Sequence, residues 1–334
     1  MSVEESSALA NRVRKNARHL ERWARRAGIE AYRLYDRDIP EFPYAIDRYG
    51  EWLHVQLFEG KRPLSDADVE THVNALADAV HCPRARIVLK HRQRQRGSAQ
   101  YERLAADGES FTVSEYGLRF EVNLKRYLDT GLFLDHRETR RLVRDQARGR
   151  RVLNLFAYTG SFSVYAGAGG AERVVTVDLS KTYQDWTWRN LVLNGLDDRT
   201  VQQLVCTDVL KYLHEVVAGR ERYDLIVLGP PSFSNSKRMR ATFDVQRDQA
   251  ALLSAALALL APRGTLYFST NRQGFRLAPE LAERGLFTEL DRETLAEDFR
   301  RRRGTVVVGR RSVRMAGSAH PNRCRAYTSN VTIE

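Results

Sequence analysis

Residues 151–163 read RVLNLFAYTGSFS, and this stretch decides the fold. An apolar, strand-like run ends at Phe156, and Gly160 follows just before a helical pattern. A glycine in a strand-to-helix turn lets the backbone approach a ligand closely, and the helix N-terminus favours a carboxylate or a phosphate. The stretch therefore predicts the first strand and the ligand loop of a parallel sheet.

The same alternation of strand and helix continues to the C-terminal side. Further apolar runs end at Val177, Val205 and Leu228, a fifth covers 265–269, and helical stretches lie near 161–168, 181–194, 208–217 and 244–261. Buried strands joined by crossover helices predict an α/β fold with a doubly wound parallel sheet. Ligands of such sheets bind at the carboxyl ends of the strands, so we look for chemistry there.

Two carboxylates stand at neighbouring strand ends. Asp178 follows the second strand and can accept hydrogen bonds from both hydroxyls of a ribose. Asp208 follows the third strand and can accept from an adenine amino group, although a helix N-cap is the alternative for this residue. The sequence contains neither G-x-G-x-x-G nor G-x-x-x-x-G-K-[ST], which argues against a dinucleotide and against a nucleoside triphosphate.

The fourth strand ends in the sequence Gly229-Pro230-Pro231-Ser232-Phe233. Two consecutive prolines are stiff and lack N–H groups, so they cannot continue a central strand. A rigid corner that ends in an aromatic residue is suited to hold a flat base beside a bound cofactor. An ordinary strand-terminating loop is the alternative.

The N-terminal third predicts a smaller unit. An apolar stripe predicts a helix over 8–28, and strand-like runs at 31–35, 51–58 and 86–90 with a helix at 65–80 predict an α+β domain. A hairpin is expected from 110–114 and 118–122. The predicted division is a basic helix at 1–28, a small α+β domain at 29–109 to which the basic runs assign the partner described below, a hairpin and linker contributing to the cofactor site at 110–150, and the cofactor-binding domain at 151–334.

The charge of the chain favours a polyanionic partner. Lys and Arg total 54 against 42 Asp and Glu, a formal net charge of +12. The cations gather on the N-terminal helix, on the run 90–96, in the stretch 300–319 and just after the diproline corner, where each cluster taken alone could be a solvated face. The residues expected to contact RNA are Arg12, Arg14, Lys15, Lys90, Arg92, Arg94, Arg96, Lys237 and Arg238.

Cysteine usage and hydropathy bear on the compartment. Cys82, Cys206 and Cys324 are scattered without zinc-type spacing, which suits a reducing environment. No apolar run approaches the length that a bilayer requires, and the start of the chain lacks a signal-type segment. We expect a cytoplasmic protein without a metal site.

Several motifs together resemble one family. The segments YLDTGLFLDHR (127–137), NLFAYTGSFS (154–163) and PPSFSNSKRM with TFDVQRD (within 230–248) resemble the bacterial 23S rRNA guanine-N7 methyltransferases, the K half of the fused large-subunit methyltransferase K/L. The resemblance runs from about residue 8 to about residue 299. It implies a class I methyltransferase (Rossmann-like) fold, S-adenosyl-L-methionine as cofactor and 23S rRNA as substrate. The rRNA would be methylated before the large subunit is fully assembled.

The resemblance also implies roles for single residues. The diproline loop (Pro230, Pro231, Ser232 and Phe233) would position the base, with no general base. The residues expected to bind the cofactor are Phe133, Asp135, Arg137, Asn154, Phe156, Ala157, Tyr158, Thr159, Gly160, Asp178, Leu179, Ser180, Asn194, Asp208, Val209 and Gly229.

One departure leaves an alternative open. The family's Asp-Pro-Pro reads Gly229-Pro230-Pro231 here, so a catalytically weakened RNA-binding or ribosome-assembly protein is the second hypothesis. Cytosine C5 methylation would need a cysteine nucleophile, and neither candidate loop contains one. A methyltransferase for a small molecule or a protein would leave the basic run 90–96 unexplained. The fused family carries a second, N-terminal half, and this chain is expected to be a stand-alone or excised unit.

Overall fold

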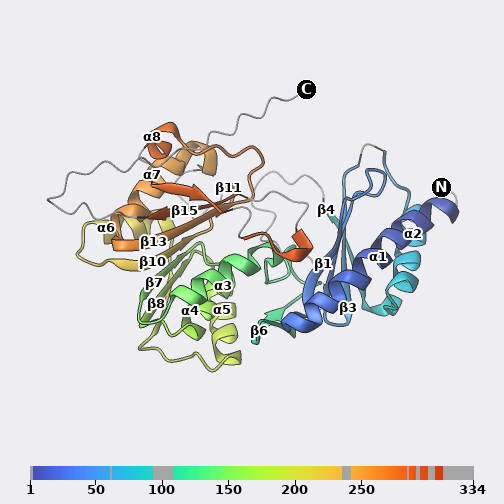
Figure 1. The fold of residues 1–334 in the computed structure, drawn as a ribbon, viewed down its shortest axis with the longest axis horizontal. Coiled ribbons are helices and arrows are strands. Elements are labelled where there is room, and N and C mark those ends of the chain that lie inside the picture. The colour runs from blue at the N-terminus through green and yellow to red at the C-terminus, as the bar shows by residue number, and fades with distance from the viewer. Residues whose placement is uncertain are drawn as a thin grey trace.

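The computed structural model describes residues 3–60, 62–92, 108–234, 242–283, 286–290, 294–299 and 305–310. These residues form a four-stranded sheet, a seven-stranded sheet and two short two-stranded hairpins. In Figure 1 the N-terminal elements, in blue and cyan, lie on one side of the molecule, and the larger α/β part lies on the other.

The smaller sheet has the order β1-β2-β3-β4, in which β3 and β4 are parallel and the other neighbours are antiparallel. Strand β2 was not among the predicted runs. The elements of this part are α1 (Val3–Ala27), β1 (Ala31–Asp36), β2 (Tyr44–Tyr49), β3 (Trp52–Phe58), α2 (Asp66–Ala79), η1 (Arg84–Arg86) and β4 (Ile87–Arg92).

Helices α1 and α2 cover one face of this sheet. The predicted stripe of α1 is confirmed, because all its apolar residues are buried against α2 and the sheet: Leu9, Val13, Ala17, Leu20 and Ala24. Helix α2 begins at a capping box in which the Ser65 side chain accepts from the Asp68 N–H and the Asp68 side chain accepts from the Ser65 N–H. Burial of the apolar faces and this cap explain why the two helices form where the sequence places them.

The larger sheet has the order β14-β15-β13-β10-β7-β8-β9. Five of its strands are mutually parallel, as predicted: β13, β10, β7, β8 and the edge strand β9. Its elements are β7 (Arg151–Leu155), α4 (Ser161–Ala168), β8 (Arg173–Asp178), α5 (Lys181–Leu193), β9 (Gln202–Cys206), α6 (Val209–Val217), β10 (Tyr223–Leu228), α7 (Val245–Ala258), β13 (Leu260–Thr270), α8 (Pro279–Ala282), β14 (Phe287–Glu289), η4 (Glu297–Phe299) and β15 (Thr305–Arg310).

Successive residues of the central strands are buried on opposite sides of the sheet. In β7, Leu153 belongs to the core that includes α6 and α7, whereas Val152 packs with α3 and α4. Both faces are therefore covered by helices, and the prediction of a doubly wound α/β fold is confirmed.

Part of the C-terminal stretch joins the larger sheet. Residues 300–319 were expected to form a basic RNA-contacting cluster, of which 300–304 and 311–319 lie outside the described residues. Strand β15 pairs antiparallel with β13, with Thr265 opposite Arg310. Strand β14 then pairs antiparallel with β15. The run of three valines at 306–308 is typical of a buried strand, which explains why this part of the stretch joins the sheet.

A hairpin and a helix connect the two sheets. The predicted hairpin is confirmed as β5 (Phe111–Glu115) and β6 (Leu118–Val122). It is followed by η3 (Leu134–His136) and by α3 (Arg137–Gln146), which was not predicted. Phe120 and Val122 of the hairpin are buried with Val164 and Tyr165 of α4. The domain limits at 28, 109 and 150 stay a prediction. In the ranges that the structure describes, no helix is both long and apolar enough to cross a bilayer.

Candidate functional site

A cleft of about 990 Å³ lies between the two sheets. It is lined on one side by the carboxyl ends of β7, β8 and β10 with the loops that follow them, and on the other by β2, β3 and β4 of the smaller sheet. Its volume falls at the upper end of the range of small-molecule sites, about 300–1,000 Å³. The cleft is thus the place where ligand chemistry was predicted.

The turn from β7 to α4 has an unusual backbone. Phe156, Tyr158 and Gly160 all have φ in the left-handed region, at 56°, 52° and 71°. A Cβ atom on Gly160 would lie 2.2 Å from Thr187 Cγ2, so only glycine fits there. Such backbone conformations concentrate at functional sites, which agrees with the predicted role of this loop.

The predicted residues of this loop divide into two groups. Asn154, Phe156 and Tyr158 line the cleft, although the Asn154 amide donates to Ser163 Oγ at 2.9 Å. Ala157 and Thr159 are buried and do not line it. Thr159 Oγ1 donates to the Gly131 carbonyl oxygen at 2.5 Å, which attaches the loop to the segment before η3. These two side chains therefore shape the loop instead of facing a ligand.

Asp178 lies in the cleft at the end of β8. Its carboxylate accepts from the backbone N–H of Tyr158 and of Ser180, each at 2.9 Å. Burial raises the pKa of this carboxyl to about 6, although the two hydrogen bonds act in the opposite direction. Leu179 and Ser180 also line the cleft. A half-buried carboxylate aimed into a cleft is suited to accept from ligand hydroxyls.

The structure shows one of the two roles predicted for Asp208, and the adenine contact stays a prediction. It is the N-cap of α6, and its Oδ1 accepts from the N–H groups of Leu210 at 2.8 Å and Lys211 at 3.1 Å. The residue also lines the cleft, together with Val209. The cap uses Oδ1 and fixes the carboxylate after the end of β9, and no hydrogen bond to Oδ2 occurs within the described ranges.

The segment before α3 supplies aromatic and polar groups. Phe133 and Asp135 line the cleft as predicted, and the Phe133 ring centroid lies 4.9 Å from that of Tyr158. Arg137 does not reach the cleft. Its fully buried guanidinium forms ion pairs with Glu115 at 2.9 Å and Asp298 at 2.6 Å, which corrects the prediction.

His136, one residue earlier, lines the cleft where Arg137 was expected. Its Nδ1 is buried and has no hydrogen-bond partner in the described part of the chain. Burial lowers the pKa of this imidazole, so the ring is neutral and can pair with a ligand group. His136 was not among the residues predicted to bind the cofactor.

The diproline corner faces the same cleft. Gly229, Pro230, Pro231, Ser232 and Phe233 all line it. The corner leads into a short hairpin of β11 (Phe233–Ser234) and β12 (Phe243–Asp244), and nearly half of the Phe233 side-chain surface is exposed, at 47%. An exposed aromatic ring next to a rigid turn is suited to stack on a base. Lys237 and Arg238 lie outside the described residues.

Asn194 was expected to bind the cofactor, and the structure corrects this. It caps the C-terminus of α5, where its Nδ2 donates to the carbonyl oxygens of Arg119 and Asn190 and its Oδ1 accepts from the Arg119 N–H. The side chain therefore joins α5 to the β6 hairpin. It does not line the cleft.

The predicted RNA-binding cations are found in different environments. Lys90 is buried, and its ammonium donates to the carbonyl oxygens of Tyr127 and Leu128, which corrects its assignment to an exposed phosphate track. Arg92 lines the cleft.

The three predicted cations of α1 lie on its outer faces. Arg12 pairs with Asp38 at 3.4 Å, Arg14 donates to the Asn11 side chain, and Lys15 is exposed. Arg94 and Arg96 lie outside the described residues.

Sequence reasoning missed the wall that the smaller sheet contributes. Arg33, Asp47, His54 and Gln56 line the cleft, although they come from strands far from the cofactor loop in sequence. The signal that could have found the residues of β3 is the alternation along 53–57, where the polar His54 and Gln56 alternate with apolar residues.

The residues present fit the predicted S-adenosylmethionine. Two carboxylates stand at the ends of the neighbouring strands β8 and β9, a glycine turn precedes α4, and aromatic rings and an unpaired buried His136 nitrogen face the same cleft. Carboxylates suit the ribose hydroxyls and the adenine amino group, and a helix N-terminus suits the methionine carboxylate.

Known proteins support this interpretation. Residues 46–302 match the family model of S-adenosylmethionine-dependent methyltransferases. Ribosomal RNA large subunit methyltransferase K of Neisseria meningitidis is 46% identical over 299 residues, which cover 88% of this chain and 84% of that protein. Ribosomal RNA large subunit methyltransferase K/L of Stutzerimonas stutzeri is 49% identical over 302 residues, which cover 89% of this chain but 41% of the relative.

Among solved structures, SMU.776 in complex with S-adenosylhomocysteine (SAH) has a TM-score of 0.73 at 25% identity, with 91% of this chain and 81% of that chain covered. The resemblance inferred from the motifs is confirmed by these matches. The chain belongs to the S-adenosylmethionine-dependent methyltransferase family.

Proposed function

We propose that this protein transfers a methyl group from S-adenosylmethionine to N7 of a guanine in large-subunit ribosomal RNA, in the cytoplasm. The observation that carries the proposal is that one cleft is lined both by the strand ends expected to bind the cofactor and by the diproline corner expected to hold the base. The two relatives named above are ribosomal RNA large subunit methyltransferases, which supports an RNA substrate of that kind.

The roles of the chain's own residues follow from their positions. Asp178 would hold the ribose, Asp208 the adenine amino group, and the loop around Gly160 with Phe133, Asp135 and His136 the methionine end. When bound, S-adenosylmethionine supplies an activated methyl group on a sulfonium. The protein orients this group toward the base and excludes water from it.

Guanine N7 carries a free lone pair and no proton, so the site needs alignment instead of a general base. Proximity and orientation alone contribute up to about 7–11 kcal/mol to such a displacement. Among the cleft-lining residues that the structure describes, none is a cysteine, which agrees with N7 chemistry and disfavours attack on cytosine C5. Pro230 and Pro231 would hold the base, and Phe233 would stack on it.

The N-terminal helix would contact the RNA backbone. A hollow of about 470 Å³ on α1 is lined by Arg22, Arg25 and Arg26, whose guanidinium groups suit phosphate oxygens, and by His19, whose Nε2 lies 2.8 Å from Glu297 Oε1. Arg92 would add a cation at the mouth of the cleft. A base in paired RNA would have to leave its stack to reach the cofactor, so unassembled or partly assembled large-subunit RNA is the expected substrate.

Cofactor affinity is expected to depend on pH through Asp178, whose pKa is raised to about 6 by burial. Ribose hydroxyls donate to the ionised carboxylate, so the ligand binds the deprotonated form more tightly. The affinity for SAH should be constant above about pH 7 and fall by about tenfold per unit below about pH 6. Calorimetric titrations across that range measure it, and a flat profile would rule out a ribose contact by Asp178.

Substitution of Gly229 by Asp distinguishes two hypotheses, an active enzyme and a catalytically weakened assembly protein. A Cβ at 229 would lie 3.7 Å from Ser269 Oγ, an ordinary contact, so the backbone accommodates a side chain there. We expect turnover on RNA to stay within about threefold of wild type, roughly 0.6 kcal/mol, because N7 loses no proton. A gain of more than tenfold in turnover at unchanged SAH affinity would instead favour the weakened protein.

The experiment for the proposed function uses unmodified large-subunit rRNA and labelled S-adenosylmethionine. We expect 7-methylguanosine in the nucleoside mass spectrum, with mature ribosomal subunits as a poor substrate. Methylation of cytosine or of a guanine amino group would refute the proposed reaction.

A further inference from the structure

The smaller sheet presents a polar face to the cleft. In β3, Leu53 and Val55 belong to the apolar core under α1 and α2, whereas the alternating His54 and Gln56 line the cleft. Asp47 of β2 lies opposite His54 in register and lines the cleft too. The sheet thus has one apolar face for folding and one polar face toward the ligand space.

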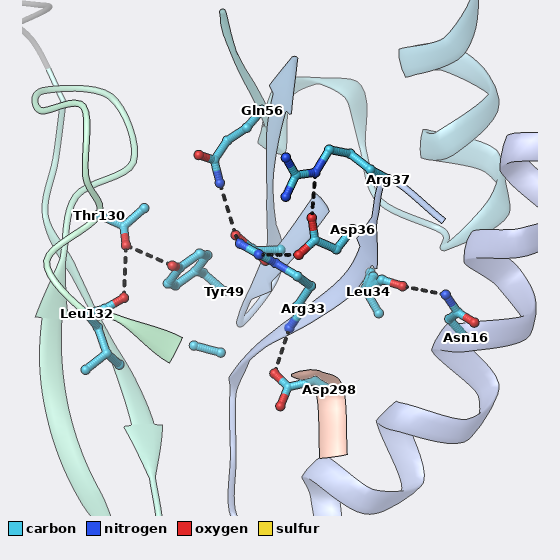
Figure 2. A network of polar contacts seen from close by, with 12 residues as sticks. Asn16, Arg33, Leu34, Asp36, Arg37, Tyr49, Gln56, Thr130, Leu132 and Asp298 are labelled. Atoms are coloured by element: carbon cyan, nitrogen blue, oxygen red, sulfur yellow. Dashed lines mark hydrogen bonds and ion pairs between the residues drawn. The ribbon is translucent and has the colours of Figure 1, made fainter. Parts of the chain in front are cut away.

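Most polar groups on this face are paired with one another. Arg33 donates to both oxygens of Asp47, at 2.7 and 3.0 Å, and Gln56 Nε2 donates to Asp47 Oδ2 at 3.2 Å. Arg92 donates to Gln56 Oε1 at 2.7 Å and to Asp129 Oδ1 at 2.9 Å. Figure 2 shows Arg33 and Gln56 in this network. The wall is therefore fixed before any ligand arrives.

His54 is different from its neighbours. Its side chain is fully buried, and neither ring nitrogen has a hydrogen-bond partner within the described ranges. The ring lies edge-on to Tyr49, with centroids 6.3 Å apart, and it lines the cleft. Buried polar groups are normally paired, so an unpaired imidazole at a cleft indicates that its partner arrives with the ligand.

The surroundings keep His54 neutral. Burial, followed by Lys90, Arg92 and Arg33, holds the pKa of the imidazole well below its usual value. A neutral imidazole has one N–H donor and one acceptor nitrogen. The unprotonated nitrogen of His54 can accept a hydrogen bond from a ligand, whereas the neighbouring side chains of Lys90, Arg92 and Arg33 can only donate.

In the proposed reaction, a hydrogen-bond acceptor on the smaller sheet can help to recognise the target base. Guanine and adenine both carry N7, so this atom cannot distinguish them. The two bases differ beside N7, where guanine has the O6 acceptor and adenine an amino donor, and again on the far edge, where guanine alone has an amino group beside N1–H. When N7 faces the cofactor at the strand ends, this edge faces away from the cofactor. The polar face of the smaller sheet bounds the cleft on that side.

We propose that His54 accepts a hydrogen bond from the exocyclic amino group of the target guanine, so that the smaller sheet selects the base while the larger sheet holds the cofactor. This inference rests on the proposed guanine-N7 reaction. It makes His54 a specificity residue on the substrate side of the cleft.

The test compares synthetic RNAs of the mapped target site that carry guanosine or inosine, which lacks the amino group, at the methylated position. Wild type should prefer guanosine by about tenfold or more in kcat/KM. The His54→Phe variant should lose about tenfold on guanosine RNA, and its preference should shrink to within about twofold. Its affinity for SAH should remain at the wild-type value.

The matched control is His72→Phe. His72 is another buried histidine of the smaller domain, but it pairs with the Tyr44 hydroxyl at 2.9 Å and does not line the cleft. This control should keep the wild-type preference for guanosine. His54→Gln should regain part of the preference, because its amide supplies an acceptor.

One result would overturn the assignment of His54, a His54→Phe variant that prefers guanosine as strongly as wild type. An equal loss on both RNAs is such a result and would indicate a structural role. Failure of the proposed function is detected in a separate and earlier experiment, in which the wild-type enzyme forms a methylated nucleoside other than 7-methylguanosine. That result would refute both proposals.

Discussion

Substitution of Asp178 by Asn is expected to weaken SAH binding by about a hundredfold. The variant replaces a charged acceptor by a neutral amide that can accept through one oxygen only. Hydrogen bonds to charged groups contribute about 1.5–3 kcal/mol each, and two ribose hydroxyls are involved. Calorimetry near pH 7.5 measures the change.

The matched control for this variant is Asp224→Asn. Asp224 lies at the start of β10, at the opposite end of the sheet, where it accepts from the Arg151 N–H at 2.9 Å. This variant should bind SAH as wild type does. Wild-type affinity in Asp178→Asn would remove Asp178 from the cofactor site.

The same substitution should change the melting temperature of the free protein little near pH 7.5, because removing the buried charge offsets the loss of one of the two backbone hydrogen bonds to Asp178. The folded-state pKa of Asp178 is raised from 3.8 to about 6, so the native state binds more protons than the unfolded state between these values. Stability from this group is therefore lost as pH rises through that window, and the ionised carboxylate is a cost at neutral pH. A ligand that pairs with the carboxylate offsets this cost.

Replacement of Glu115 by Ala is expected to destabilise the fold strongly. The Glu115 carboxylate lies between two arginines, 2.9 Å from Arg137 Nε and 2.7 Å from an Arg140 terminal nitrogen, and all three side chains are fully buried. Removal of one partner leaves buried charges without compensation, which costs about 3–5 kcal/mol. The melting temperature should fall by roughly 10 °C, since each kcal/mol shifts it by about 2–4 °C in a large domain.

The control is Glu70→Ala, which removes an exposed ion pair with Arg84 at 3.0 Å. Water and salt screen an exposed pair of this kind, so the change should leave the melting temperature nearly unchanged. Similar melting temperatures for the two variants would show that the buried cluster is not needed for stability.

The sequence predicted those features that depend on local patterns. The stripe of α1, the hairpin of β5 and β6, and the strand–helix alternation after Arg151 all repeat at the periods of regular structure, and the structure has them where they were expected. Asp178 and Asp208 were found for the same reason, because strand ends can be located from apolar runs.

The errors arise where tertiary packing decides. Arg137 and His136 are adjacent, and only the direction of α3 determines which of them enters the cleft and which meets Glu115. Lys90 looks like an exposed cation in sequence, but parallel pairing of β4 with β3 buries it under the segment at Tyr127. Charge alone could not reveal these partners.

Other features were missed although a signal existed. Polar residues alternate with Leu53 and Val55 in β3, which indicates a sheet with two unlike faces. That the polar face lines the cofactor cleft depends on the contact between two sheets distant in sequence, which no local pattern records.

The central claim is that S-adenosylmethionine lies across the carboxyl ends of β7, β8 and β9. Hydrogen–deuterium exchange with and without SAH tests it directly. We predict slower exchange for backbone amides at 156–161, 178–183 and 208–211, and unchanged exchange in α1 and α2. Binding of SAH without protection at these three strand ends, or no binding at all, would contradict the account.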